Sequence, residues 1–231
     1  MRWTAATDTG PVRSLNEDLA LGRPDLGLWA VADGMGGHGG GDVASRLAID
    51  HLDQMAPAAG AAELLATTRQ RLAAAHEALR GHSRRLGLGR PIGCTIAVLL
   101  LHGGHFCGLW AGDTRIYLWR GGHLHQVTHD HTVVQELVDQ GAILAADAAR
   151  HPARNMVTRA LGAMDRLALD SRQGVLHTGD RFLICSDGVH GALEAAALAG
   201  LMQADDPAAA SVGAALAAGS RDNATAIAVM P

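Results

Sequence analysis

The sequence predicts an α+β fold in which antiparallel β-sheets pack against each other and are flanked by helices. Short apolar runs, which are typical of strands, occur in groups instead of alternating singly with helices. Segments with an approximate 3.6-residue period are grouped as well, in the first half and again near the carboxyl end. This segregation favours packed antiparallel sheets over a parallel, doubly wound sheet built from βαβ units.

The first part of the chain contains three expected strands, at residues 3–7, 18–22 and 28–33. Turn-forming residues separate them. A glycine-rich loop, GMGGHGGG, follows and leads into a helix for which we expect Asp42 to be the N-cap. Ala61 to His82 predicts a second helix, closed by Gly81 and by the glycine-rich stretch before Pro91.

From Thr95 the pattern changes to closely spaced apolar runs, TIAVLLL, HFCGLWAG, RIYLW and LHQVT. They predict an antiparallel meander with hairpin turns at Gly103-Gly104 and Gly121-Gly122. Residues 131–140 predict a short amphipathic helix, and a polar, alanine-rich excursion continues to Leu161. The remaining expected elements are a strand at 182–185, helices at about 192–203 and 207–218, and a last strand at 224–229.

Composition describes an ordered globular protein. Of 231 residues, 48% are hydrophobic and 18% are charged, which differs from the composition of a disordered chain. No Pro/Ser-rich or charged linker divides the sequence, so we expect one domain over residues 1–231. A net charge of −4 and the lack of a basic stripe disfavour nucleic acid as a partner.

Neither end of the sequence nor its interior predicts a membrane segment. The amino-terminal MRWTAATDTG has no apolar h-region, and nowhere do 18 uninterrupted apolar residues occur. Cys94, Cys107 and Cys185 are widely spaced within apolar runs, as reduced and packed cysteines are. We therefore expect a soluble, cytoplasmic monomer. A catalytic role for Cys185 is disfavoured, because no base adjoins it in the sequence.

Four aspartates stand at the ends of expected strands: Asp33, Asp113, Asp187 and Asp222. An isolated charge at the end of a buried strand would cost on the order of several kcal/mol. Mg²⁺ and Mn²⁺ compensate such charges, because they prefer carboxylate, carbonyl and water oxygens. The pattern therefore predicts a carboxylate-metal hydrolase.

The glycine-rich loop has a second interpretation. Residues 34–39 formally match the dinucleotide fingerprint G-x-G-x-x-G between a strand and a helix. However, Asp33 would then face the pyrophosphate without a cation, and the following helix leads into another helix instead of a parallel strand. A P-loop is excluded because no Lys-Ser/Thr pair closes the loop.

A histidine-rich segment also admits two interpretations. Even spacings place His123, His125 and His129 on one strand face, where a zinc site is geometrically possible. The simpler interpretation is an exposed strand face that runs into a helix capped by Asp130 or Thr128. We favour the simpler interpretation.

The run Arg13-Ser14-Leu15-Asn16-Glu17-Asp18 places a guanidinium, an amide and two carboxylates within six residues. Such a charge cluster alone is usually a solvated turn. Beside the four strand-end aspartates it supplies what a metal-dependent hydrolase needs. Glu17 can add oxygen ligands for a metal or its water, and Arg13 can bind phosphate bidentately.

Seven motifs then occur in order between about residues 4 and 229: RSLNED, VADGMGGH, AGDTR, THDHTVVQELVDQG, HPARNMVTRALG, CSDGV and SRDNAT. With them the chain resembles the bacterial branch of the metal-dependent protein phosphatases of the protein phosphatase 2C type. The resemblance implies an α-β-β-α four-layer sandwich, with two antiparallel sheets and helices on each outer face. It also implies a centre of two Mn²⁺ or Mg²⁺ ions at one end of the sandwich.

The resemblance implies a role for each matching residue. Asp33 would bridge both ions, the Gly34 carbonyl and Glu17 would serve one of them, and Asp187 and Asp222 would serve the other. These roles come from the matching motifs and not from the spacing of the residues.

Further roles follow from the same motifs. Asp18 would orient metal-bound water, and Arg13 would hold the substrate phosphate. Asp113 corresponds to a ligand of a third, weaker metal in bacterial relatives, which Asp187 shares. Residues of about 131 to 160 would form a flap beside the cleft.

The chemistry expected of such a centre is hydrolysis by a hydroxide that bridges two cations about 3.5–4 Å apart. In-line attack on phosphorus needs no phosphoenzyme, and Arg13 and the metals would stabilise charge on the phosphoryl oxygens. Eukaryotic relatives place a histidine, a proposed general acid, where this chain has Met35. The proton donor to the leaving group is therefore open, with metal-bound water or His38 as candidates, although we favour a structural role for His38.

We therefore expect a serine/threonine protein phosphatase that acts on phosphorylated Ser/Thr proteins, among them a cognate Ser/Thr kinase and its targets. One alternative is a catalytically silent module that binds phosphoproteins or regulates a kinase. Such a module should have lost metal ligands, and none is missing here. Another alternative is a hydrolase of small phosphate compounds, against which the expected flap argues.

Overall fold

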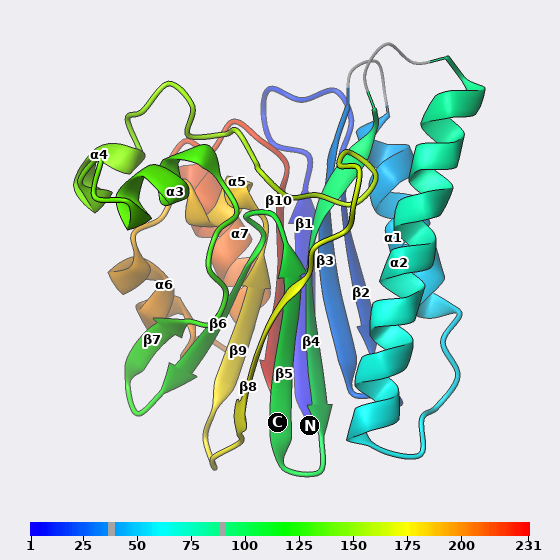
Figure 1. Cartoon of the computed structure of the whole chain (residues 1–231). Helices are drawn as coiled ribbons and strands as arrows, with labels where there is room; N and C mark the ends of the chain where they lie inside the picture. The colour runs from blue at the N-terminus through cyan, green and yellow to red at the C-terminus, as the bar shows by residue number, and fades with distance from the viewer. Residues whose placement is uncertain (37–39, 88–90) are drawn as a thin grey trace.

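The computed structural model describes residues 1–36, 40–87 and 91–231 and shows two five-stranded antiparallel sheets packed face to face (Figure 1). One sheet has the order β1-β10-β9-β6-β7, with strands Arg2–Asp8 (β1), Ala224–Met230 (β10), Arg181–Cys185 (β9), Arg115–Arg120 (β6) and His123–Gln126 (β7). The other has the order β2-β3-β4-β5-β8, with strands Asp18–Arg23 (β2), Leu28–Met35 (β3), Gly93–His102 (β4), His105–Ala111 (β5) and Asp170–Val175 (β8). The α+β class with two antiparallel sheets is confirmed.

Helices cover both outer faces, which completes the α-β-β-α sandwich (Figure 1). Two long helices pack on the sheet that contains β3 and β4: Gly41–Asp53 (α1) and Ala61–Arg85 (α2). Three lie on the side of the other sheet: Asp187–His190 (α5), Ala195–Leu201 (α6) and Pro207–Ala217 (α7). Val133–Asp139 (α3) and Ala145–Ala148 (α4) stand at the end of the sandwich opposite the two termini (Figure 1).

The period of two along the strands explains the layers. On β3, Leu28, Ala30 and Ala32 face the cluster under α1 and α2, whereas Trp29 and Val31 face the cluster between the sheets. β4 divides in the same way and is buried on both sides over nearly its whole length. A third cluster joins α6 and α7 to the β9 and β10 face. Three apolar layers therefore separate the four layers of secondary structure.

The predicted meander is wrong in one respect. β4 pairs with β5 and β6 pairs with β7, but β5 and β6 belong to different sheets. The chain crosses from one sheet to the other at Gly112, whose φ of +107° permits the sharp change of direction. The two hairpin turns are confirmed, since Gly103, Gly104, Gly121 and Gly122 all have positive φ.

The predicted helix ends also need correction. α1 begins at Gly41 without a side-chain cap, so Asp42 lies inside the first turn, and Glu17 instead accepts the Gly41 N–H at 3.1 Å. α2 passes through Gly81 to Arg85, and the chain leaves it at Gly87 with a φ of +60°.

The cap of α3 differs from both predicted residues. Thr132 caps the helix by accepting the Gln135 N–H at 3.2 Å. Asp130 instead pairs with Arg115, and the Thr128 hydroxyl accepts the Ile116 N–H. Both side chains are buried and tie the segment after β7 to the start of β6.

Candidate metal centre

Five aspartates gather at the end of the sandwich that carries the β1–β2 loop. Asp18 begins β2 and stands opposite Asp33 of β3 in the antiparallel register. Asp187 begins α5 directly after β9, and Asp222 lies just before β10. Asp113 follows β5 in the crossover. The structure therefore brings all the predicted strand-end carboxylates to one place.

The pKa values of these carboxyls show how closely the groups interact. Burial, followed by the charges of Asp18, Asp187, Asp113 and Asp222, raises the pKa of Asp33 well above its usual range. Burial is also the main reason why the pKa of Asp18 and that of Asp113 are each raised to about 7. A cluster with this much mutual repulsion is stabilised by cations.

Asp187 lies between this cluster and the arginine at its rim. Burial, and then the charge of Asp222, raises the pKa of Asp187 to about 6. The charge of Arg13 and hydrogen bonds, one of them with Asp33, act in the opposite direction. Asp33 and Asp187 are thus hydrogen-bonded to each other.

Asp18 is held from the opposite sheet. Its Oδ2 accepts a hydrogen bond from the Ser186 hydroxyl at 2.7 Å, and the same hydroxyl accepts the Thr225 N–H at 3.0 Å. Asp18 is buried, with 6% of its surface exposed. An anchored and buried carboxylate of this kind is suited to orienting a neighbouring group, the role that the resemblance implies for Asp18.

Glu17 and Gly34 form one wall of the centre. The Glu17 carbonyl accepts the Gly34 N–H at 3.1 Å, and its side chain binds the start of α1 through Gly41. A Cβ on Gly34 would overlap the Gly41 carbonyl oxygen. This close approach of two backbone segments requires glycine at position 34 and leaves the Glu17 carboxylate beside the end of β3.

Asn223 organises the loop that carries Arg13 and Glu17. Its Oδ1 accepts the Glu17 N–H at 2.8 Å, and its Nδ2 donates to the carbonyls of Thr9 and Leu15 at 2.8 and 3.0 Å. One buried amide thus fixes the β1–β2 loop at three points. The sequence predicts no role for Asn223, whose position directly after Asp222 is the one available signal.

Arg13 is paired with Asp222. Its Nε and Nη2 donate to the two carboxylate oxygens of Asp222 at 2.8 and 2.7 Å, and its side chain is half exposed. The pair raises the pKa of Arg13 further and keeps the guanidinium charged. A phosphate held by Arg13 would share this guanidinium with the Asp222 carboxylate or displace that carboxylate from it.

The turn that carries Asp113 is fixed from three sides. The Thr95 and Thr114 hydroxyls lie 2.5 Å apart, which ties the turn to β4. The His131 ring Nδ1 accepts the Gly112 N–H at 3.2 Å, and the His131 backbone N–H donates to the Gly112 carbonyl at 3.0 Å. His190 of α5 donates to the Asp113 carbonyl at 2.9 Å. Burial lowers the pKa of His190 to about 3, so the imidazole is neutral at pH 7 and its N–H is on Nε2.

The donor chemistry fits divalent cations. Carboxylates and a backbone carbonyl are the ligands that Mn²⁺ and Mg²⁺ prefer, and burial beside like charges raises the pKa values of these carboxyls, which a nearby cation would lower. Within residues 1–36, 40–87 and 91–231, no three His, Cys, Asp or Glu side chains already converge as a set of ligands. The Arg13–Asp222 pair lies at the exposed rim of this cluster.

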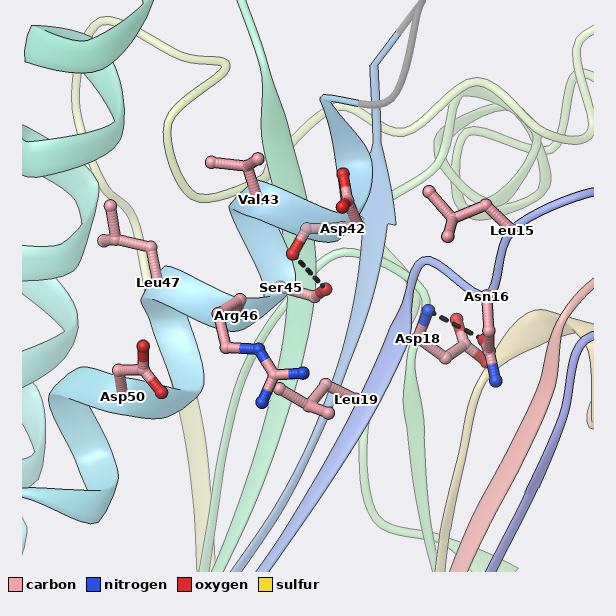
Figure 2. A pocket seen from close by; sticks show the side chains of 10 residues that line it. All are labelled: Leu15, Asn16, Asp18, Leu19, Asp42, Val43, Ser45, Arg46, Leu47 and Asp50. Atoms are coloured by element: carbon pink, nitrogen blue, oxygen red, sulfur yellow. Dashed lines mark hydrogen bonds between the residues drawn. The ribbon is translucent and has the colours of Figure 1, made fainter.

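A cavity of about 450 Å³ lies between α1 and the β1–β2 loop, beside this centre (Figure 2). Leu15, Leu19, Val43 and Leu47 give it apolar walls, and Asp18 is its one link to the five aspartates. Arg46 extends from α1 toward Leu19 of β2, as Figure 2 shows. The other four aspartates lie outside this cavity.

The alternative sites are not supported. His123 and His125 lie side by side on β7 with ring centroids 6.3 Å apart, but His129 pairs with Asp139 at 2.7 Å, so the zinc interpretation is wrong. Burial raises the pKa of the Cys185 thiol to about 12, which excludes it as a nucleophile at neutral pH. His38 lies outside the described residues. Within the described part of the chain, no helix combines the length and the apolar character that crossing a membrane requires.

Replacement of Gly188 by alanine is expected to destabilise the protein by about 1–3 kcal/mol, because a Cβ there would overlap the Asn223 carbonyl oxygen. The matched control is Gly200→Ala in α6, where nothing lies within 4 Å of the added carbon and a small stabilisation is expected. Urea unfolding of both variants checks this pair. Equal midpoints would contradict the close contact between α5 and the Asp222 loop.

Comparison with known proteins agrees with this geometry. The family model described as protein phosphatase 2C matches residues 15–223. The serine/threonine protein phosphatase PstP of Mycobacterium tuberculosis is 38% identical over 193 residues, which are 82% of this chain and 36% of PstP. The chain therefore spans about a third of the length of that relative.

Solved structures are similar over nearly the whole chain. PppA, described as a key regulatory component of T6SS in Pseudomonas aeruginosa, is 36% identical with a TM-score of 0.91, covering 98% of this chain and 96% of that one. The catalytic domain of PstP in complex with two manganese ions is 32% identical with a TM-score of 0.85, covering 98% and 96%. With the matched family model, these similarities show that the chain belongs to the protein phosphatase 2C family.

Proposed function

We propose that this protein is a metal-dependent serine/threonine protein phosphatase. The observation that carries the proposal is the joint placement of five interacting aspartates and Arg13 at one end of the sandwich. The chain's membership in the protein phosphatase 2C family supports the same activity. We also propose a single catalytic domain over residues 1–231, with residues of about 131 to 160 as a flap.

The ions proposed are two Mn²⁺ or Mg²⁺, with a third, weaker one. The two-ion centre would be held by Asp33, Gly34, Glu17, Asp187 and Asp222, and the third ion by Asp113 with Asp187. When bound, the ions would supply an activated water for attack on phosphorus and would neutralise charge on the phosphoryl oxygens. The manganese complex of PstP supports the choice of metal.

The chain's own groups would complete the reaction. Asp18, fixed by Ser186, is placed to orient water next to Asp33. Arg13 is placed at the exposed rim, where its guanidinium can meet a phosphate dianion. Met35 has no acidic proton to donate, so the donor to the leaving oxygen would be a water molecule or His38.

Replacement of Arg13 by alanine is expected to lower kcat/KM for a phosphopeptide about 10- to 100-fold. Loss of a charge-assisted hydrogen bond is worth about 1.5–3 kcal/mol, and the effect should be mainly on KM. The same change frees Asp222, so Mn²⁺ should bind at least as tightly as in the wild type. Steady-state kinetics and calorimetric Mn²⁺ titration check the two parts.

Two further variants control this prediction. Arg13→Lys keeps the charge but loses the two-pronged contact and should fall between wild type and alanine. Arg85→Ala, at an exposed position near the end of α2, should change neither quantity. An unchanged KM in Arg13→Ala would contradict the assignment of Arg13 to phosphate.

The proposed substrates are phosphorylated serine and threonine residues of proteins, among them a cognate Ser/Thr kinase and its targets. PstP, which is named a serine/threonine protein phosphatase, supports this choice of substrate. We propose that the protein is a monomer and that it is cytoplasmic. The cytoplasmic location is supported by three free cysteines, two of which are buried. The net charge of −4 is consistent with a partner other than nucleic acid.

Hydrolysis of a phosphothreonine peptide beside p-nitrophenyl phosphate, each with Mn²⁺ and with EDTA, tests the proposal. We expect Mn²⁺-dependent turnover of both, with a higher kcat/KM for the peptide. Preference for p-nitrophenyl phosphate and other small esters would favour a small-molecule phosphatase. Silence with every substrate and metal would favour the alternative, a phosphoprotein-binding regulator of a kinase.

A further inference from the structure

The short helix α5 joins two parts of the metal centre. Its first residue is Asp187, and its last residue is His190. Because residues three apart lie on the same side of a helix, both side chains point to one face of α5. On that face stands the Asp113 turn, and the charge of Asp187 acts directly on Asp113.

α5 is itself held in place on its other side. The Ser220 hydroxyl donates to the Gly188 carbonyl at 2.7 Å, and Gly188 packs against the Asn223 backbone so closely that no Cβ would fit. Asp222 lies between Ser220 and Asn223 in the sequence, so both contacts hold the Asp222 loop against α5. Movement of α5 relative to the Asp222 loop is therefore restricted.

The Asp113 turn has one hydrogen-bonded link to this unit. His190 Nε2 donates to the Asp113 carbonyl oxygen at 2.9 Å, and among the described residues it is the only side-chain hydrogen bond between α5 and that turn. The other contacts of the turn lead elsewhere, to β4 through Thr95 and to the base of the proposed flap through His131. Among the described residues, the His190 side chain is thus the hydrogen-bonded tie between the Asp113 backbone and the helix that carries Asp187.

We propose that His190 is a positioning residue that sets the separation of the Asp113 and Asp187 carboxylates by holding the Asp113 carbonyl against α5. The inference rests on the proposed function, since these two carboxylates are the ligands proposed for the third ion. His190 does not touch that ion or the substrate. It acts through the backbone of Asp113, and its loss removes the hydrogen bond that holds the turn to α5, while the anchors to β4 and His131 remain.

Direct Mn²⁺ binding tests the inference, by calorimetry and by the electron paramagnetic resonance signal of free Mn²⁺. The variants are Asp113→Ala, which defines the binding class that depends on Asp113, His190→Leu, which removes the N–H donor, and His190→Gln, which keeps one at similar reach. His190→Met is a second donor-free variant if His190→Leu does not fold. His102→Leu, at an exposed position at the far end of β4, is the matched control.

We expect His190→Leu to weaken the binding class that Asp113→Ala removes by about 10- to 100-fold, the usual effect of losing a group that supports a metal ligand. The other binding classes should stay unchanged, and His190→Gln should restore most of the lost affinity. Unchanged binding in His190→Leu, equal weakening of every class, or failure of His190→Gln to restore affinity would overturn the inference.

Because binding is read without substrate, the result separates this inference from the proposed activity. Weakened binding in His190→Leu combined with an inactive wild type would keep the positioning role and reject the phosphatase. Normal binding in His190→Leu combined with an active wild type would reject the positioning role and keep the phosphatase. In an active wild type, the Mn²⁺ concentration for half-maximal turnover should shift in His190→Leu, whereas KM for the peptide at saturating Mn²⁺ should not.

Discussion

Replacement of Asp33 by asparagine is expected to abolish phosphate release, by more than about 10³-fold at saturating Mn²⁺. Asp33 lies opposite Asp18 in the register, contacts Asp187, and has its pKa raised by all four other aspartates. It is therefore the residue best placed to serve two ions at once. Asparagine keeps the shape of the side chain and removes the charge that cations require.

The control for this variant is Asp25→Asn, an exposed carboxylate that pairs with Arg23 far from the centre. It should retain wild-type turnover. Circular dichroism and thermal melting in EDTA should show that Asp33→Asn is folded and at least as stable as the wild type, because a buried charge has been removed. Turnover in Asp33→Asn within tenfold of the wild type would show that Asp33 does not hold the catalytic ions.

Replacement of Asp113 by asparagine is expected to stabilise the metal-free protein, and increasingly so as the pH rises. Burial, followed by the charges of Asp187 and Asp130, raises the pKa of Asp113 to about 7 in the folded state. In the unfolded chain the pKa is about 3.9. Between these two values the folded wild type binds more protons than the unfolded chain, so its free energy of unfolding falls as the pH rises.

Asparagine does not titrate, so the difference between variant and wild type reports the removal of this carboxylate together with the relief of its repulsion on Asp33. In EDTA we expect similar stability at pH 4.5 and a growing advantage of Asp113→Asn up to about pH 8, on the order of 4 kcal/mol at most. Urea unfolding at four pH values measures it. A difference that does not change with pH would show that Asp113 is already ionised when folded at pH 5.

Most strands could be predicted from the sequence because their apolar runs are local signals. The crossover at Gly112 could not be predicted, because nothing in HFCGLWAG or RIYLW indicates which strands these two segments pair with. β8 was missed because DSRQGV is a polar, largely exposed edge strand without an apolar alternation. α5 was missed because four residues are too few to show a helical period.

The residues of the site likewise include some that could be predicted from the sequence and some that could not. The strand-end aspartates could be found because a charge directly after an apolar run is unusual in any sequence. Their supporting groups could not, because Ser186 meets Asp18 across 168 residues of sequence and Asn223 meets Glu17 across 206. Arg13 was predicted to be a phosphate ligand, but its two-pronged pairing with Asp222 depends on how the β1–β2 loop folds.

The measurement that tests the central claim most directly is phosphate release from a phosphothreonine peptide by metal-free protein, as Mn²⁺ is added back stepwise. The account predicts no turnover in EDTA, turnover that appears only as Mn²⁺ binds, and none at any Mn²⁺ concentration for Asp33→Asn. Turnover by the wild type that persists in EDTA, or that Asp33→Asn shares, would contradict the assignment of the aspartate cluster as a metal-dependent phosphatase centre.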